Sequence, residues 1–336
     1  MTALPSETRS TLPAEARSSG RGDALASFEE LVERLSIQSV QKHFEAYEDV
    51  DWDSPAFAVE RTDPRWELPA DVNGLGSTTW YRSLPPEIRA EIGLYLVATF
   101  MKTGLQFESV LKRGLLELAF DLPNGDPKFR YAYHEVIEEA QHSLMFQEFV
   151  NRTGFDIQGL GWRERRASRF IVSLGRRFPE LFLMFVLGGE DPIDHVQREA
   201  LRNDRDMPPI LERIIRIHVT EEARHLSFAR HYLKLRAPEI GAVRRMVLGI
   251  GTPIILGVMA QQMMRPSRSM IRRYSIPREV VREAYTDNPD HAQRTKDALR
   301  KVRRLGEEIG IVNAMTKPIW KLLGIWDDAS DPAPAR

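Results

Sequence analysis

The stretch HVTEEARH, residues 218–225, places two histidines and a glutamate at spacings of four and then three residues. Each residue of an α-helix is rotated by about 100° from the one before, so His218, Glu222 and His225 fall on one narrow stripe. All three side chains are good metal ligands, although a solvated polar stripe would show the same spacing. The rest of the chain must supply partners if this stripe binds a metal.

A second Glu-x-x-His pair lies upstream, where Glu139-Ala-Gln-His142 repeats the spacing of Glu222-Ala-Arg-His225. One such pair on each of two helices, with a single glutamate from each of two further helices, is the ligand arrangement of ferritin-like carboxylate bundles. The pattern predicts an all-α, ferritin-like helical bundle. It also predicts two more glutamates, one upstream of each pair.

Two glutamates have the required positions. Glu108 and Glu190 precede the first glutamates of the two pairs by 31 and 32 residues. The midpoints of these intervals fall in DLPNGDP (121–127) and RNDRDMPP (202–209), which carry the Pro, Asn and Asp residues typical of turns. If each interval is an antiparallel helical hairpin, each single glutamate lies level with its Glu-x-x-His pair.

Neighbouring glutamates compete for these roles. Glu138 and Glu221 each directly precede a predicted ligand, and the Glu-x-x-His spacing selects the residue that follows. Glu117 shares a predicted helix with Glu108, where the distance from the turn favours Glu108. A lone Glu-x-x-His pair is more often a surface feature than a ligand pair. Two pairs with mirrored glutamates are much harder to obtain by chance.

The residue types suit a two-metal centre. Carboxylates are hard ligands that can bridge two cations, and neutral imidazoles complete the coordination while leaving positions open for dioxygen. Four carboxylates neutralise two divalent ions, whereas four glutamates buried without metal would be very costly.

The remaining pattern is helical. Apolar residues recur every three or four positions, and no segment alternates strictly as a strand does. One helical domain is expected over 24–325, with flanking helices around a ligand-bearing core at about 85–235 and disordered tails at 1–23 and 326–336. Helices are expected near 24–48, 86–120, 128–153, 163–202 (with a break near Gly175 and Pro179), 207–235, 238–265 and 290–322.

Composition narrows the functional classes. The 336 residues carry a formal net charge of −1 and no arginine-rich arm flanked by aromatics, which argues against nucleic-acid binding. The absence of cysteine excludes disulfides, iron–sulfur clusters, thiolate zinc sites and a cysteine nucleophile. The N-terminal stretch has no apolar run like that of a signal peptide, so we expect a cytoplasmic protein.

One apolar stretch needs separate judgement. MVLGIGTPIILGVMA, residues 246–260, is apolar all round but shorter than the roughly 20 residues that a membrane span needs. Arg244, Arg245 and Arg265 bound it closely. We interpret it as a helix buried against the bundle and not as a transmembrane segment, with a peripheral lipid contact as the alternative.

The complete set of predicted ligands has seven members, one more than a plain ferritin-like site needs, and His218 is the additional one. The set resembles that of the p-aminobenzoate N-oxygenase (AurF-like) family of di-iron enzymes over residues 85–235, with hairpin order and spacings retained. In that family a third histidine lies one turn before the last Glu-x-x-His and binds iron. The seven residues are Glu108, Glu139, His142, Glu190, His218, Glu222 and His225.

The resemblance implies a cofactor and a reaction. It implies two iron ions, with manganese as a substitute, and dioxygen as co-substrate for oxidation of an aryl amine through hydroxylamine towards a nitro product. No dinucleotide-binding fingerprint is present, so a separate ferredoxin or reductase would supply electrons to this monooxygenase. The substrate would be a small molecule, and a homodimer is compatible with the sequence.

Other assignments stay open at this point. Glu135, one turn before the first Glu-x-x-His pair, is a candidate eighth ligand or a hydrogen-bond acceptor for His142. A fatty-acyl desaturase or hydroxylase would fit the apolar stretch 246–260, and a non-catalytic ferritin-like metal-binding protein would use similar ligands. His134 and His195 lie off the ligand stripes, and we interpret them as ordinary polar positions.

Overall fold

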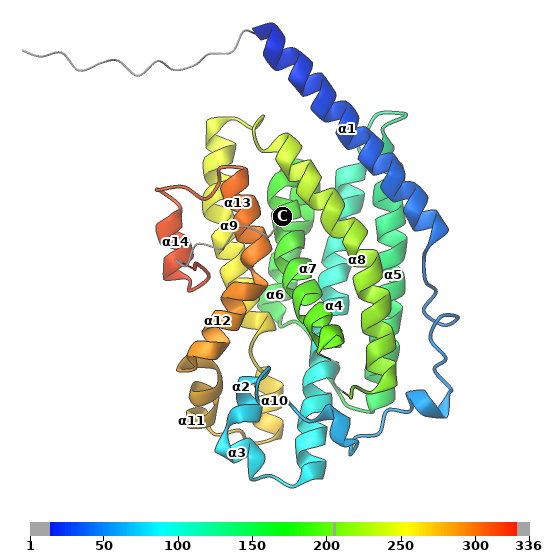
Figure 1. The fold of residues 1–336 in the computed structure, drawn as a ribbon, viewed down its shortest axis with the longest axis vertical. Coiled ribbons are helices and arrows are strands. Elements are labelled where there is room, and N and C mark those ends of the chain that lie inside the picture. The colour runs from blue at the N-terminus through cyan, green and yellow to red at the C-terminus, as the bar shows by residue number, and fades with distance from the viewer. Residues whose placement is uncertain (1–13, 204–205, 328–336) are drawn as a thin grey trace, which may run out of the picture.

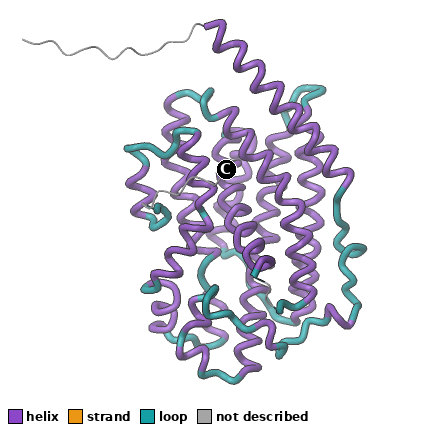
Figure 2. The backbone as a smooth tube through the Cα atoms, in the orientation of Figure 1, coloured by secondary structure: helices purple, strands orange, loops and turns teal. Residues whose placement is uncertain are grey.

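The described part of the chain consists of helices and loops. The computed structural model describes residues 14–203 and 206–327, and no strand occurs within them (Figure 2). The prediction of an all-α bundle is confirmed.

The longer helices are α1 (Ala14–Gln41), α4 (Pro86–Ala119), α5 (Pro127–Thr153), α6 (Trp162–Arg177), α7 (Pro179–Arg202), α8 (Pro209–Arg236) and α9 (Ala242–Met263). The shorter elements are η1 (Pro55–Phe57), η2 (Pro64–Trp66), α2 (Gly74–Ser77), α3 (Thr79–Arg82), α10 (Arg268–Arg273), α11 (Arg278–Val281), η3 (Arg282–Thr286), α12 (Pro289–Ala298), α13 (Arg300–Glu308) and α14 (Lys317–Leu322).

Two helical hairpins form the centre of the bundle (Figure 1). Helix α4 packs against α5, and α7 packs against α8. The connections between the paired helices fall where the two predicted turns lie in the sequence. At the first turn, the Asp126 side chain accepts a hydrogen bond from the Lys128 backbone N–H, and Pro127 occupies the first helical position. These two residues therefore favour the start of α5 at Pro127, which agrees with the turn position predicted from the spacing of the glutamates.

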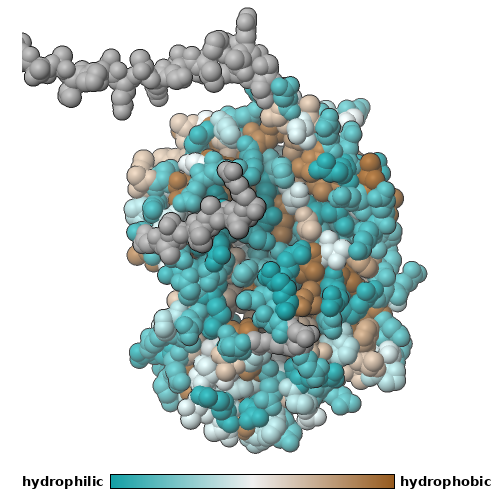
Figure 3. Space-filling view, viewed as in Figure 1, coloured by the Kyte–Doolittle hydropathy of each residue, from teal (hydrophilic) through white to brown (hydrophobic). Residues whose placement is uncertain are grey.

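Further helices cover the two hairpins. Helix α1 packs against α5 and α8, α6 against α4 and α7, and α9 against α7 and α14. Helices α4 and α6 approach closely at two glycines, since a Cβ added at Gly175 would lie 2.0 Å from the carbonyl oxygen of Gly114. The view in Figure 3 shows a mostly hydrophilic surface on which apolar side chains form small groups.

Some helix boundaries differ from expectation. The break near Gly175 and Pro179 is confirmed. Phe178, between α6 and α7, has φ −149° and ψ 69°, which is not a helical conformation. The proline that follows it disfavours the helical conformation at this position. The stretch 290–322 is divided into α12, α13 and α14, with Gly310 at a left-handed φ of 75° after α13.

The N-terminal helix is also shifted relative to the sequence prediction. Helix α1 begins at Ala14, not near residue 24, so the expected disordered tail is wrong for residues 14–23. It ends at Gln41, and four short helical elements lie in the following segment up to Arg82. The remainder of the two expected tails, 1–13 and 328–336, lies outside the described residues.

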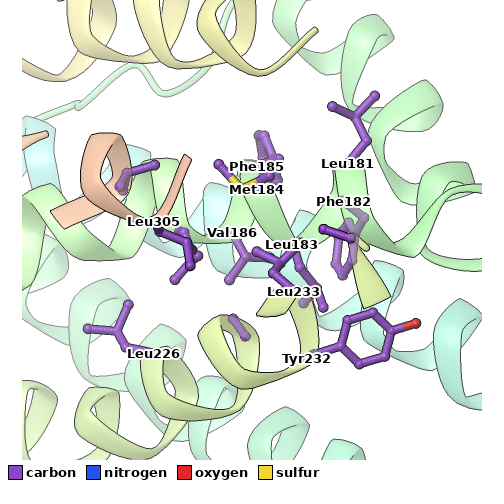
Figure 4. Close-up of a cluster of buried hydrophobic side chains, with 14 of the residues drawn as sticks. Leu181, Phe182, Leu183, Met184, Phe185, Val186, Leu226, Tyr232, Leu233 and Leu305 are labelled. Atoms are coloured by element: carbon purple, nitrogen blue, oxygen red, sulfur yellow. The ribbon is translucent and has the colours of Figure 1, made fainter. Parts of the chain in front are cut away.

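Helix α7 is the most deeply buried helix of the hairpins. Six consecutive residues, Leu181 to Val186, are all buried and face neighbouring helices on several sides (Figure 4). Leu226 and Leu233 of α8 and Leu305 of α13 belong to the same cluster. A helix surrounded by other helices is apolar all round, which explains the uninterrupted apolar run that precedes Glu190.

Helix α9 is less buried than expected. We expected residues 246–260 to be covered by the bundle, but only 39% of the apolar window in Ala242–Arg273 is buried. By length and composition this is the one helix among the described residues that could cross a membrane. One side of it packs on α7, whereas the side that carries Val243, Val247 and Ile254 is exposed, because no further helix of the described chain covers it.

Candidate metal centre

All seven predicted ligands converge at the centre of the two hairpins. They come from all four central helices, and none is more than about 1% exposed. Helix α4 contributes Glu108, α5 contributes Glu139 and His142, α7 contributes Glu190, and α8 contributes His218, Glu222 and His225. Side chains more than a hundred residues apart in the sequence therefore share one buried site.

Six of the seven form overlapping triads, in each of which one ligand atom per residue lies within 4.8 Å of the others. The triads share His142, His218 and Glu222, so they describe one continuous site. The triads are Glu108 with His142 and His218, Glu139 with His142 and Glu222, and Glu190 with His218 and Glu222.

His225 belongs to the same site. Its Nδ1 lies 3.1 Å from Glu139 Oε1 and 3.1 Å from Glu222 Oε1. His142 likewise directs Nδ1 at these two carboxylates, at 3.6 Å from Glu139 and 3.8 Å from Glu222. The two Glu-x-x-His pairs therefore present the same ring nitrogen to a shared pair of carboxylates, which is the internal symmetry that the spacing predicts.

His218 approaches from the other ring nitrogen. Its Nε2 lies 4.0 Å from Glu108 Oε1, 4.0 Å from Glu190 Oε2 and 3.9 Å from Glu222 Oε1. Burial lowers the pKa of His218 well below its usual value, and the charge of His142 lowers it further. A neutral imidazole among three carboxylates is the form that binds metal.

An outer pair of carboxylates orients the histidines. Glu221 Oε2 lies 2.8 Å from His142 Nε2, and Glu138 Oε2 lies 2.7 Å from His225 Nε2. Each contact joins α5 to α8, because each histidine is held by the glutamate of the opposite helix. An acceptor at Nε2 places the proton there and leaves Nδ1 free to bind a cation.

Arg224 links these two outer carboxylates. Its guanidinium donates a hydrogen bond to Glu138 Oε1 at 2.8 Å and lies 3.6 Å from Glu221 Oε1. Burial alone would raise the pKa of Glu138, but His225 and Arg224 hold this pKa at about 2. Glu138 therefore remains an anion next to the centre.

A hydrogen bond from Ser143, which in turn accepts one from Lys112, fixes the position of Glu108. Ser143 Oγ donates a hydrogen bond to Glu108 Oε2 at 2.7 Å. Lys112 Nζ donates to the same Ser143 hydroxyl and to the Glu139 carbonyl at 2.8 Å. The single glutamate of the first hairpin is thus fixed by its own partner helix.

Without metal, protons balance much of the buried charge. Burial raises the pKa of Glu108 to about 8, and the nearby Glu139 adds to this shift. Burial also raises the pKa of Glu190 well above its usual value. Burial alone would raise the pKa of Glu139 too, but its interactions with His142 and His225 hold that pKa below the usual value. Cations that enter this site must displace protons.

The donor set fits a pair of cations. Buried polar atoms normally have hydrogen-bond partners, and buried carboxylates without them are costly. Here several oxygen and nitrogen atoms of the predicted ligands have no hydrogen-bond partner within the described chain, and carboxylates with imidazoles suit divalent iron or manganese. The atoms are Glu108 Oε1, both carboxylate oxygens of Glu139, His142 Nδ1, Glu190 Oε2, His218 Nδ1 and Glu222 Oε2.

Glu135 is buried beside the site, and the expectation that it accepts a hydrogen bond from His142 is wrong. Glu221, not Glu135, lies against His142 Nε2, because α8 and not the preceding turn of α5 faces that nitrogen. Glu135 belongs to none of the ligand triads, and burial raises its pKa to about 8. His134 and His195 lie outside the centre, as expected: His134 contacts Arg130 at 3.3 Å, and His195 is about a third exposed.

Sequence reasoning missed the outer residues. It treated Glu138 and Glu221 as rivals of the ligands, whereas the structure uses both to hold histidines. The signal was present, since each Glu-x-x-His pair is preceded by a second glutamate. The seven-residue ligand assignment itself stays a prediction, which this convergence supports.

Comparisons with known proteins agree with this geometry. A family model described as P-aminobenzoate N-oxygenase AurF matches residues 26–310. Uncharacterized proteins from Mycobacterium bovis and Mycobacterium tuberculosis are 39% identical over 300 residues, which cover 89% of this chain and 88% of each relative. No solved structure matches the chain significantly.

Proposed function

Because the chain belongs to the p-aminobenzoate N-oxygenase (AurF) family and carries its di-iron oxygenase domain, we propose that it is an aryl-amine monooxygenase. The resemblance to this family is confirmed by the family match over residues 26–310, and the seven predicted ligands are the residues on which we base the proposal. The proposed reaction takes an aryl amine to the hydroxylamine and onward towards the nitro compound.

The buried convergence of four carboxylates and three imidazoles carries this proposal. Glu139 and Glu222 each lie close to both His142 and His225, so these four side chains would hold the cations together. The remaining three side chains would complete the coordination of the two ions. When bound, the irons supply the redox chemistry that activates dioxygen.

The protein's own contribution is orientation and exclusion of water. Glu221 and Glu138 fix the rings of His142 and His225, so that Nδ1 of each faces the centre. Phe146 packs over the ring of His218 with centroids 5.5 Å apart, and all seven predicted ligands are buried. A dry environment favours oxygen chemistry by preventing loss of reactive species to water.

The proposed reaction requires an external electron source. When dioxygen converts an amine to a hydroxylamine, one oxygen atom enters the new N–O bond and the other leaves as water. Two electrons and two protons are consumed in that step. We propose a separate ferredoxin or reductase as the donor, since the sequence has no dinucleotide-binding fingerprint.

Product analysis tests the proposal. Iron-loaded protein is chemically reduced, mixed with isotopically labelled dioxygen and screened against aryl amines and fatty acids. The proposal requires labelled hydroxylamine or nitro product from an amine. A hydroxylated or desaturated fatty acid would identify another di-iron oxidase, and iron uptake with no organic product would favour a metal-binding protein. Either result would contradict the proposed substrate class.

A further inference from the structure

Helix α9 presents a continuous apolar face to the outside of the bundle. The exposed residues recur at intervals of three and four, so they form one stripe along the helix. With 22 residues at 1.5 Å each, α9 is about 33 Å long. We call this the α9 face, and its residues are Val243, Met246, Val247, Ile250, Ile254 and Val258.

The opposite side of α9 is part of the protein core. Leu248 and Leu256 are fully buried in the main hydrophobic cluster, and α9 packs against α7 and α14. Met315, just before α14, and Leu322 within it are also exposed apolar side chains. Because one side of α9 is covered by α7 and α14, only its other side is available to lipid.

The charged residues in the segment that contains the α9 face are all arginines. Residues 240–278 contain seven arginines and no aspartate or glutamate. Arg244 is paired with Glu180 at the start of the helix. At the other end, Arg268 and Arg272 are exposed and form no ion pair within the described chain. The apolar stripe therefore ends at free positive charge.

We propose that the α9 face docks on an anionic lipid surface, with the helix lying in the membrane plane. Apolar side chains inserted at the level of the acyl-chain boundary, next to arginines at the headgroups, are the characteristic arrangement of interfacial helices. Arginine forms paired hydrogen bonds with phosphate, and positively charged residues near an anionic leaflet are attracted to it. The oxygenase would thus act as a peripheral membrane protein.

The same charges disfavour a second copy of the chain as the occupant. A two-fold contact would place identical faces together, since such interfaces are self-complementary. The segment 240–278 offers no carboxylate to compensate the arginines of the partner copy. Anionic phosphate groups provide that compensation. The apolar stripe would be buried both by lipid and by a second copy of the chain. The charge therefore distinguishes lipid from a second copy.

Vesicle flotation tests the proposal with the full, metal-loaded chain. The wild type is expected to float with vesicles of phosphatidylcholine and phosphatidylglycerol, and less with phosphatidylcholine alone. The double variant Ile250→Ser/Ile254→Ser should bind about tenfold or more weakly, because two apolar contacts are lost. Replacing Arg268 and Arg272 by Gln should weaken binding to the anionic vesicles by about fivefold per arginine.

A matched control changes apolar exposure elsewhere. Ile137 and Leu144 on α5 are 54% and 44% exposed, close to the 39% and 47% of Ile250 and Ile254. Ile137→Ser/Leu144→Ser should float as the wild type does, and circular dichroism establishes that all variants are folded. Absence of wild-type flotation, or equal loss in the control, would overturn the proposal. So would light scattering that shows a wild-type dimer converted to monomer by the α9 variant, because a second copy would then cover the face.

Discussion

Replacing Glu221 by Gln should weaken metal binding, although Glu221 is not a predicted ligand. Its Oε2 lies 2.8 Å from His142 Nε2, and its Oε1 accepts a hydrogen bond from the Phe44 backbone N–H at 3.1 Å. If Nδ1 of His142 binds metal, Nε2 carries the proton and must find an acceptor. A glutamine that keeps its oxygen towards Phe44 presents its NH₂ group to that proton, so two donors face each other.

The size of the effect follows from the bond that is lost. A hydrogen bond to a charged group contributes about 1.5–3 kcal/mol, and here the charge is fully buried. Loss of partners that orient metal-bound histidines typically costs about 10–100-fold in metal affinity. That range corresponds to about 1.4–2.8 kcal/mol, so the two arguments agree.

Anaerobic titration of ferrous iron against a chelator measures this affinity. Glu138→Gln should give a similar loss at His225, because Glu138 Oε2 lies 2.7 Å from that ring. Glu33→Gln removes an exposed carboxylate on α1 and should leave the affinity unchanged. Wild-type affinity in a folded Glu221→Gln protein would refute the orienting role.

Four further predictions concern the centre itself. Reconstituted protein should hold about two irons per chain by metal analysis and Mössbauer spectroscopy, and a content of one or none would contradict the ligand set. Glu139→Ala and Glu222→Ala should each abolish oxygen consumption while circular dichroism stays helical; full turnover would mean that the ligand is misassigned. His218→Ala should retain two irons but oxidise amines more slowly, and stopped-flow traces with oxygen that superimpose on the wild type would exclude a ligand role. For the metal-free protein, the pKa values of Glu108 and Glu135 are about 8 when folded, above the ordinary 4.5 of the unfolded chain. The native state therefore binds these protons more tightly, and the stability they give is lost as the pH rises towards 8. The melting temperature should fall between pH 5 and 8, and a flat profile would refute these shifts.

The sequence was sufficient to predict which of these side chains converge, because helix geometry is regular. Both helices of a hairpin rise by 1.5 Å per residue, so equal distances from a turn bring residues to the same height. Glu108 and Glu190 were selected in this way, and both lie with the Glu-x-x-His pairs. Asp126 and Pro127, which are typical of a helix start, independently indicate where α5 begins and so support the same pairing of residues across the hairpin.

The outer residues could not be placed by the same reasoning. Spacing along one helix defines which residues share a stripe, but not which stripe faces a neighbouring helix. Glu221 lies beside His142 only because of how α5 and α8 are rotated against each other. Glu135 was the local candidate for that role, one turn away on the same helix, and tertiary packing gave the role to α8 instead.

The burial of helix α9 also could not be predicted from the sequence. An apolar run is compatible with a buried helix or with an interfacial one, because periodicity cannot show how many neighbours a helix has. Helix α7, with its run from Leu181 to Val186, is surrounded, whereas α9 has protein on one side only. The arginines that bound 246–260 were visible in the sequence, but their meaning depends on that one-sided exposure.

The cross-pairing of the histidines makes the two hairpins one structural unit. Each Glu-x-x-His helix supplies a ligand histidine and also the carboxylate that orients the histidine of the other helix. Arg224 contacts both of these carboxylates, so a shift of α8 against α5 disturbs both imidazoles together. The two halves of the centre therefore cannot be formed independently. The spacing within a single helix does not encode this packing between α5 and α8, although the centre depends on it.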